Sequence, residues 1–136
     1  MLSSSLEDYL EAVLEISREN GVARTKQISS RLNVKSSSVT AALKTLNDQG
    51  YVNYKPYGFI TLTDRGVKRA EVISSRHGVL KRFLEKILGI SESEAEKTAC
   101  GMEHVLGAET AEKLESLTKH LLQDKVLLEK VKSSLE

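Results

Sequence analysis

One short segment, ACGMEHVL at residues 99–106, carries three side chains that can bind a metal ion. Cys100 is the only cysteine of the chain, Glu103 offers a carboxylate, and His104 is one of three histidines. On a helix, their spacing of i, i+3 and i+4 places all three on one face. A thiolate, a carboxylate and an imidazole that converge in this way can hold a divalent transition metal. The alternative is that Cys100 is a small buried apolar residue and His104 an ordinary surface or core histidine.

Further potential ligands lie far from this segment in the sequence. Asp8 and Glu11 are spaced i, i+3 in a segment of helical periodicity, so both carboxylates fall on one helical face at the edge of the core. His77 lies in another helical segment, after the middle of the chain. These residues could join the 99–106 segment only through the fold, and periodicity alone leaves that question open.

The spacing of apolar residues predicts a mainly helical chain with one pair of strands. The segment YVNYKPYGFITLT (51–63) alternates aromatic or β-branched residues with polar ones around Pro56-Tyr57-Gly58. This pattern is typical of a two-stranded hairpin with a basic, aromatic tip. Thr25 is expected to cap the second helix. The expected helices are a first one ending at Asn20-Gly21, Lys26 to Leu32, Ser37 to Gln49, a long one from Thr63-Asp64 to Gly89, 91–106, 108–122 and an amphipathic tail at 124–136.

This order of elements is that of a winged helix-turn-helix, in which the second helix of the pair enters the major groove of DNA. Hydroxyls and backbone N–H groups at a helix start bind phosphate oxygens, and small side chains let the helix approach the bases. The alternative is that the serines of this segment only cap helices and form loops. The expected DNA-binding residues are Thr25, Lys26, Lys35, Ser36, Ser37, Ser38, Thr40, Lys44 and, at the hairpin tip, Lys55 and Tyr57.

The distribution of charge favours a polyanionic partner for the middle of the chain. The 136 residues have a net charge of +1, but residues 18–69 carry ten Lys or Arg against three Asp or Glu. Residues 1–17 and 90–136 are each net acidic by four charges. A basic segment between acidic ends fits nucleic acid, although chance clustering of surface charge gives the same pattern.

Composition excludes several other classes of protein. A single cysteine cannot support an internal disulfide framework. No apolar run approaches the ~18 residues that a membrane span needs, and no segment has the pattern of a signal peptide. A cytoplasmic protein without membrane association is therefore expected.

At the level of whole segments, the sequence resembles a known family. The blocks SLEDYLEAVLEI, VKSSSVTAALKTLNDQGYVNYKPYGFITLTDRG, RHGVLKRFLEKILG and CGMEHVL look like the metal-dependent repressors typified by the diphtheria toxin repressor and the manganese transport regulator. The resemblance covers residues 4–122. It implies a mainly α fold with a winged helix-turn-helix DNA-binding domain at 1–70, including a two-stranded β wing. A helical dimerisation and metal-binding domain is implied at 71–136, in a short form without an SH3-like domain.

The resemblance also implies a set of metal ligands that combines the two branches of the family. Asp8 matches the manganese-type pattern, whereas Cys100 matches the iron-type pattern. Carboxylates suit Mn²⁺ or Fe²⁺, while a thiolate favours Fe²⁺, Co²⁺, Ni²⁺ or Zn²⁺. We therefore expect Fe²⁺ or Mn²⁺, with Zn²⁺, Co²⁺ or Ni²⁺ as further candidates. The implied ligands are Asp8, Glu11, His77, Cys100, Glu103 and His104.

One position departs from the family. Lys81 follows His77 by one helical turn, where both branches commonly carry a glutamate. A charged lysine cannot ligate, which argues against a second metal site. Glu96, one turn before Cys100, offers a spare carboxylate, or is simply a solvated residue of the first helical turn.

The predicted function is a metal-responsive, DNA-binding repressor of metal homeostasis that binds a palindromic double-stranded operator as a homodimer. Dimerisation is expected from apolar residues that exceed what a small helical pair can bury, unless they form an ordinary intrachain core. A metal-independent winged-helix transcription factor is the first alternative. A small metallohydrolase is the second, although no additional general base is evident beside an open metal position. The apolar residues in question are Val79, Leu80, Phe83, Leu84, Leu114, Leu117 and Leu121.

Overall fold

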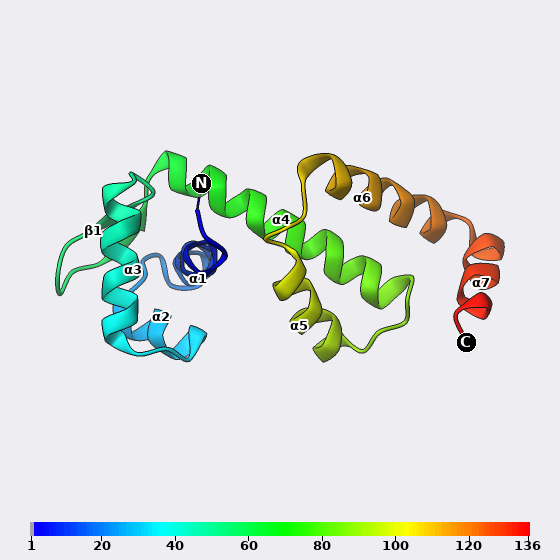
Figure 1. Ribbon diagram of the computed structural model, residues 1–136, viewed down its shortest axis with the longest axis horizontal. Helices are drawn as coiled ribbons and strands as arrows, with labels where there is room; N and C mark the ends of the chain where they lie inside the picture. The colour runs from blue at the N-terminus through cyan, green and yellow to red at the C-terminus, as the bar shows by residue number, and fades with distance from the viewer. Residues whose placement is uncertain (1) are drawn as a thin grey trace. The chain divides into compact units, whose positions relative to one another are not determined.

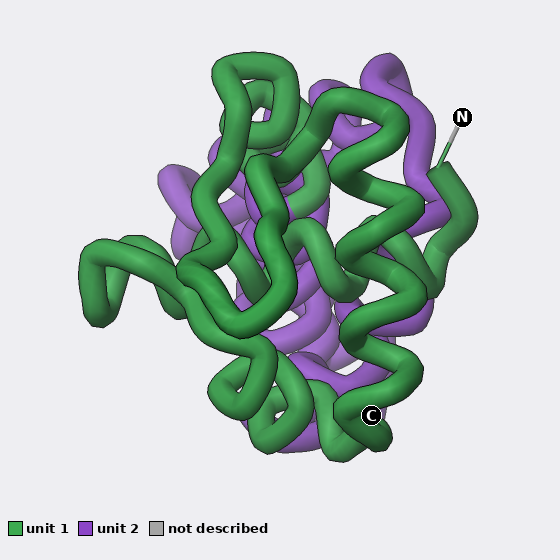
Figure 2. The backbone as a smooth tube through the Cα atoms, turned by 90° about the vertical axis from the view of Figure 1, so that its left-hand side faces the viewer, with its two compact units in different colours: residues 1–73 green, residues 74–136 purple. Residues whose placement is uncertain are grey.

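The computed structural model describes residues 2–136, which form two compact units divided after Ile73 (Figures 1 and 2). The fold is mainly helical, with one two-stranded antiparallel sheet, which confirms the predicted fold class. None of the helices in residues 2–136 is long and apolar enough to cross a membrane. The elements are α1 (Ser4–Asn20), α2 (Thr25–Leu32), α3 (Ser36–Asp48), β1 (Val52–Tyr54), β2 (Ile60–Leu62), α4 (Asp64–Lys86), α5 (Glu92–Met102), α6 (Ala108–Gln123) and α7 (Lys125–Ser134).

The first unit is organised around one apolar core to which α1, α2, α3 and both strands contribute. In α1 and α3 the buried residues recur at helical spacing, so each turns one apolar face inward, while α2 buries Ile28. Asn33 adopts a left-handed conformation (φ 52°) after α2 and lets the chain reverse into α3 within a few residues. The largest fully buried side chains in this core are Leu10, Val13, Ile16, Ile28, Val39, Leu43, Leu46, Val52, Ile60 and Ile73.

The wing is the antiparallel pair β1–β2, with Val52 opposite Leu62. One face of the wing is buried and the other is exposed: Val52 and Ile60 face the core, while Asn53 and Thr61 face solvent. Tyr54 N–H donates to the side-chain oxygen of Asn47 (3.0 Å), which ties β1 to the end of α3. The predicted hairpin is thus confirmed, and it is fastened to the third helix.

Two helix starts differ from the sequence expectation. Arg24, and not Thr25, is the N-cap residue of α2, and its backbone N–H donates to the Gln27 side chain at 2.9 Å. Periodicity marks the apolar face of a helix but does not mark its first residue. Similarly, α3 begins at Ser36 with Lys35 as its N-cap residue, so the run of serines forms the first helical turn.

The second unit has a much smaller apolar core. Leu80 and Leu84 of α4 pack on Ala95 and Ala99 of α5. These two leucines are therefore intrachain core residues, which is the alternative that the sequence left open for them. Several large apolar side chains of the same unit stay exposed: Leu88, Ile90, Met102, Val105, Leu117, Leu122, Val126 and Leu135.

The start of α4 is joined closely to the foot of the wing. Thr63 Oγ1 accepts a hydrogen bond from Gly66 N–H (3.0 Å) and donates to the carbonyl of Gly50 (2.7 Å). Gly66 itself lies against the backbone of Tyr51, so closely that an added Cβ would overlap the Tyr51 carbonyl oxygen. Only glycine fits this contact, because backbone atoms on both sides cannot move apart without breaking the joint.

The replacement Gly66→Ala is expected to destabilise the protein by about 1–3 kcal/mol, the usual cost of forcing an extra carbon into a packed site. Urea denaturation followed by circular dichroism measures this change. Gly78→Ala is the matched control on the same helix, since its Cβ would meet no atom within 4 Å. That variant should be as stable as the parent or slightly more so. Equal stability of Gly66→Ala and the parent would contradict the inferred contact.

Candidate metal centre and DNA-binding surface

The second unit contains a buried carboxylate, that of Glu103, which is 1% exposed. Glu103 is the C-cap residue of α5, and His104 lies in the turn that follows. The expectation that both belong to the helix is therefore wrong. Glu103 nevertheless keeps helical dihedral angles (φ −58°, ψ −31°), and its N–H donates to Ala99 O at 2.9 Å. It therefore extends the helical path by one residue and directs its side chain inward.

Two histidines and the cysteine surround the Glu103 carboxylate. Nδ1 of His77, from α4, lies 2.6 Å from Glu103 Oε2. Nε2 of His104 lies 3.6 Å from Oε1. A carboxylate oxygen of Glu103 and Sγ of Cys100 are within 4.8 Å of each other. The second unit thus brings together the four predicted ligands that it contains.

These residues fit a divalent cation. Oε1 of Glu103 is buried and accepts no hydrogen bond from the residues that the structure describes. A buried carboxylate with an unsatisfied oxygen is costly unless a cation or a donor compensates it. The nitrogen, oxygen and sulfur donors beside it suit a transition metal, which would supply a partner for this oxygen. Within this unit His77, Cys100, Glu103 and His104 would hold such an ion.

The protonation of His77 is shifted by the same carboxylates. Its hydrogen bond with Glu103 raises the pKa of His77 to about 9, against the lowering effect of burial, and Glu96 adds to the rise. Without a metal, the ring is therefore an imidazolium at neutral pH. Because the folded-state pKa lies above the usual value, this pairing stabilises the fold fully below about pH 6.5. Its contribution is lost as the pH rises through about 9.

Glu96 and Lys81 extend this cluster toward solvent. Oε1 of Glu96 lies 3.0 Å from Nε2 of His77, and Oε2 lies 3.2 Å from Nζ of Lys81. His77 first, and Lys81 after it, hold the pKa of Glu96 below its usual value. Glu96 is consequently an ionised partner of His77 on the side away from Glu103.

The two remaining predicted ligands, Asp8 and Glu11, belong to α1 in the first unit. Both are half-buried and stand one turn apart, as their spacing predicts. Their neighbour Glu7 is buried and receives a hydrogen bond from Nη2 of Arg69 at 2.9 Å. Glu7 therefore has a structural partner within its own unit. The assignment of Asp8 and Glu11 as ligands stays a prediction.

The candidate DNA-binding surface lies on the first unit, where α3 and the wing border a groove of about 530 Å³. Lys44 projects from α3 and is exposed, and Tyr57 at the wing tip is fully exposed in a left-handed conformation (φ 63°). The predicted residues Lys26, Lys35, Ser37, Ser38 and Lys55 are exposed but do not line this groove. The predicted residues that do line it are Thr25, Ser36, Thr40, Lys44 and Tyr57.

Arg24 is a groove residue that the sequence analysis did not identify. Its guanidinium stacks over the ring of Phe59, 4.4 Å from the ring centre. The two residues are far apart in the chain and meet because the Ala23 backbone pairs with that of Ile60. The only feature of the sequence that could have indicated Arg24 as a groove residue is its position, as a basic residue directly before the second helix.

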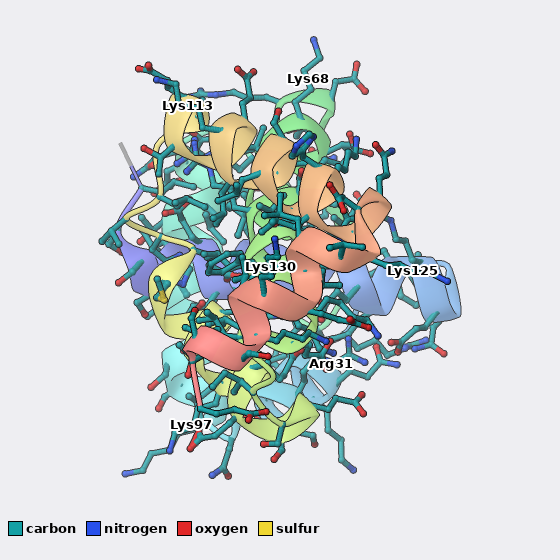
Figure 3. All side chains as sticks on the ribbon, turned by 90° about the vertical axis from the view of Figure 1, so that its right-hand side faces the viewer. Arg31, Lys68, Lys97, Lys113, Lys125 and Lys130 are labelled. Atoms are coloured by element: carbon teal, nitrogen blue, oxygen red, sulfur yellow. The ribbon has the colours of Figure 1, made fainter. Side chains whose placement is uncertain are left out.

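Residues 74–136, which form the second unit, show no comparable concentration of basic side chains around a groove. Lys97, Lys113, Lys125 and Lys130 come from three different helices, are all exposed, and are spread over the view in Figure 3. The surface suited to a polyanion is therefore the groove of the first unit.

Comparisons with known proteins match both parts of the chain to one family. Residues 1–60 match the family described as "Iron dependent repressor, N-terminal DNA binding domain". Residues 63–126 match "Iron dependent repressor, metal binding and dimerisation domain". The chain belongs to the iron-dependent repressor family. As a family member it is a transcriptional regulator with a DNA-binding domain followed by a metal-binding and dimerisation domain, which confirms the resemblance found in the sequence.

Individual relatives of this repressor family support the assignment. An HTH-type transcriptional regulator of Methanocaldococcus jannaschii is 43% identical over 114 residues, covering 83% of this chain and 91% of the relative. A manganese-dependent transcriptional repressor in complex with manganese superimposes with a TM-score of 0.77 at 26% identity, over 84% of this chain and 52% of its own. IdeR of T. acidophilum superimposes with a TM-score of 0.74 at 27% identity, over 84% of this chain and 54% of the IdeR chain. The chain thus spans about half the length of these solved chains.

In the metal-free repressor, His77→Ala leaves the buried Glu103 carboxylate without its imidazolium partner. We expect the free energy of unfolding to fall by about 1–3 kcal/mol, the usual cost of removing one partner of a buried polar pair. Denaturation in the presence of a chelator should show this loss in full near pH 6 and a smaller loss above pH 9. His120→Ala, at an exposed histidine of α6, is the control. The pairing is refuted if both variants unfold like the parent at pH 6.

Proposed function

We propose that this protein is a repressor of metal homeostasis that binds its operator when loaded with Fe²⁺ or Mn²⁺. The observation that carries the proposal is the buried Glu103 carboxylate with His77, His104 and Cys100 around it, in a chain that also has a helix-turn-helix. Such a centre is a regulatory site when its occupancy changes the affinity for DNA.

The second part of the proposal is that Asp8 and Glu11 complete the ligand set. Both residues stand on α1, whose opposite face forms a shared core with α2 and α3. Fixing these carboxylates against the histidines of the second unit would restrict the helix-turn-helix relative to the dimerisation domain. Metal and DNA binding would then strengthen each other by the same factor, typically about 5–150-fold.

The third part is that the active form is a homodimer on a palindromic operator. The second unit has a small core and leaves several large apolar side chains exposed, which fits an interface with another copy. A two-fold dimer presents two copies of α3, and paired recognition helices bind half-sites about one DNA turn apart, or a multiple of it.

The choice of metal follows from donor chemistry. Asp8, Glu11 and Glu103 are hard oxygen donors that suit Mn²⁺ or Fe²⁺, while Cys100 moves the preference toward Fe²⁺, Zn²⁺, Co²⁺ or Ni²⁺. Among related structures, one contains manganese, and ScaR has been solved with bound Zn²⁺ and with bound Cd²⁺. Fe²⁺ satisfies both kinds of donor, and Mn²⁺ satisfies the oxygen donors.

Metal control is tested by titrating operator-containing DNA at fixed salt, under anaerobic and reducing conditions, with Mn²⁺, with Fe²⁺ and with a chelator. We expect the metal to increase affinity within the range of about 5–150-fold that is usual for such coupling. His104→Ala should abolish this response, whereas His120→Ala should retain it. Equal affinities of the parent protein with metal and with chelator would instead identify a metal-independent regulator.

Lys44→Ala tests the DNA-binding surface separately from the metal. Removing one lysine–phosphate interaction per subunit should weaken binding to all sequences and reduce the slope of log K against log salt by about 0.9 for each phosphate that is no longer neutralised. Fluorescence anisotropy at several salt concentrations measures this slope. Lys113→Ala, at an exposed residue of α6, should leave it unchanged. An unchanged slope for Lys44→Ala would exclude that side chain from the interface.

A further inference from the structure

His77 lies between two carboxylates that face its two ring nitrogens. Nδ1 is 2.6 Å from Oε2 of the buried Glu103. Nε2 is 3.0 Å from Oε1 of Glu96, whose side chain is 55% exposed. The second oxygen of Glu96 lies 3.2 Å from Nζ of Lys81, one helical turn after His77 on α4. The four side chains form one continuous series from the buried centre to solvent.

This arrangement distinguishes the two nitrogens of the ring. An imidazole that binds a metal through one nitrogen usually donates its other N–H to a carboxylate, which fixes the ring orientation. The nitrogen on the buried side, Nδ1, faces the buried candidate ligand Glu103, whereas Nε2 faces a carboxylate already engaged by a lysine. Nδ1 of His77 is therefore placed to bind an ion, and Nε2 is placed to donate a hydrogen bond to Glu96, which would fix the orientation of the ring.

We propose that Glu96 and Lys81 are positioning residues of the metal centre, and this proposal rests on the proposed metal-dependent function. Glu96 accepts the Nε2–H of His77 and thereby presents Nδ1 to the ion. Lys81 holds Glu96 in this place as an ionised acceptor, outside the set of ligands. The pair thus acts on the metal through His77 and does not touch it.

The same geometry sets the number of ions. Lys81, Glu92 and Glu96 line an open hollow on the surface of α4 and α5, where two carboxylates could otherwise attract a cation. The Lys81 ammonium lies within 3.2 Å of Glu96 and 3.9 Å of Glu92, so this hollow already contains a fixed positive charge. Because the ammonium already pairs with both carboxylates, a second divalent ion would have to displace it, and we therefore expect one ion per subunit at this centre.

The decisive experiment measures Zn²⁺ binding by calorimetry in a reducing, chelator-competed buffer, and uses full-length protein. The parent protein should bind one Zn²⁺ per subunit. Glu96→Ala should bind it about 10–100-fold more weakly, the usual effect of removing a carboxylate that supports a ligating histidine. Glu94→Ala, at an exposed carboxylate of the same helix, should bind as the parent does.

Two conservative variants separate positioning from general stability. Glu96→Gln keeps a hydrogen-bond acceptor and should lose less affinity than Glu96→Ala, which also provides a test if the alanine variant folds poorly. Lys81→Met should weaken Zn²⁺ binding, and Lys81→Arg should restore it because the positive charge is kept. Long-range ¹H–¹⁵N NMR of the zinc-loaded parent protein should show Nδ1 of His77 as the bound nitrogen and Nε2 as protonated.

Three results would overturn the inference while leaving metal-dependent regulation intact. These are parent-like affinity in Glu96→Ala, ligation of His77 through Nε2, and two Zn²⁺ ions per subunit. Failure of the parent protein to bind Zn²⁺, Mn²⁺ or Fe²⁺ would instead remove the proposed function, and the inference with it. The thermal unfolding of each chelated variant confirms that the compared proteins are folded.

Discussion

The cost of burying the Glu103 carboxylate governs the chemistry of the second unit. A negative charge at 1% exposure is tolerated only with a compensating positive group. In the structure that group is the His77 ring, whose pKa is raised because its hydrogen bond with the carboxylate stabilises the imidazolium. A divalent cation offers two positive charges at the same place. A proton and the proposed metal ion would therefore compete for one site, and this competition would make metal binding depend on pH.

The placement of this carboxylate depends on how α5 ends. The helix stops at Met102, and Glu103 follows with helical dihedral angles before the chain turns. Ala95 and Ala99, on the same side, are small enough for α5 to pack closely on Leu80 and Leu84 of α4. That close packing brings His77 of α4 within hydrogen-bond distance of Glu103. Few large apolar residues are buried here, so the polar centre forms a substantial part of this interior.

Much of the fold was predictable because it depends on local patterns. Alternation identified the hairpin, and helical periodicity identified the inward faces of α1 and α3. Two features depended on contacts between distant residues and were missed: Arg24 stacking on Phe59 and the bridge from Glu96 to His77. The end of α5 at Met102 was missed as well. Likewise, Leu80 and Leu84 fit an interface or a core equally well until α5 is placed beside them. The candidate ligands were visible in the sequence, whereas the contact of Glu96 with both His77 and Lys81 was not.

The joint between the wing and α4 has a mechanical consequence. Gly66 touches the Tyr51 backbone, and Thr63 links the residue before Tyr51 to the first turn of α4. The guanidinium of Arg65 adds a hydrogen bond to the carbonyl oxygen of Gln49 at 2.8 Å. These contacts fasten the beginning of α4 to the backbone of residues 49–51, directly before β1. A tilt of this end of α4 would therefore also displace the base of the wing.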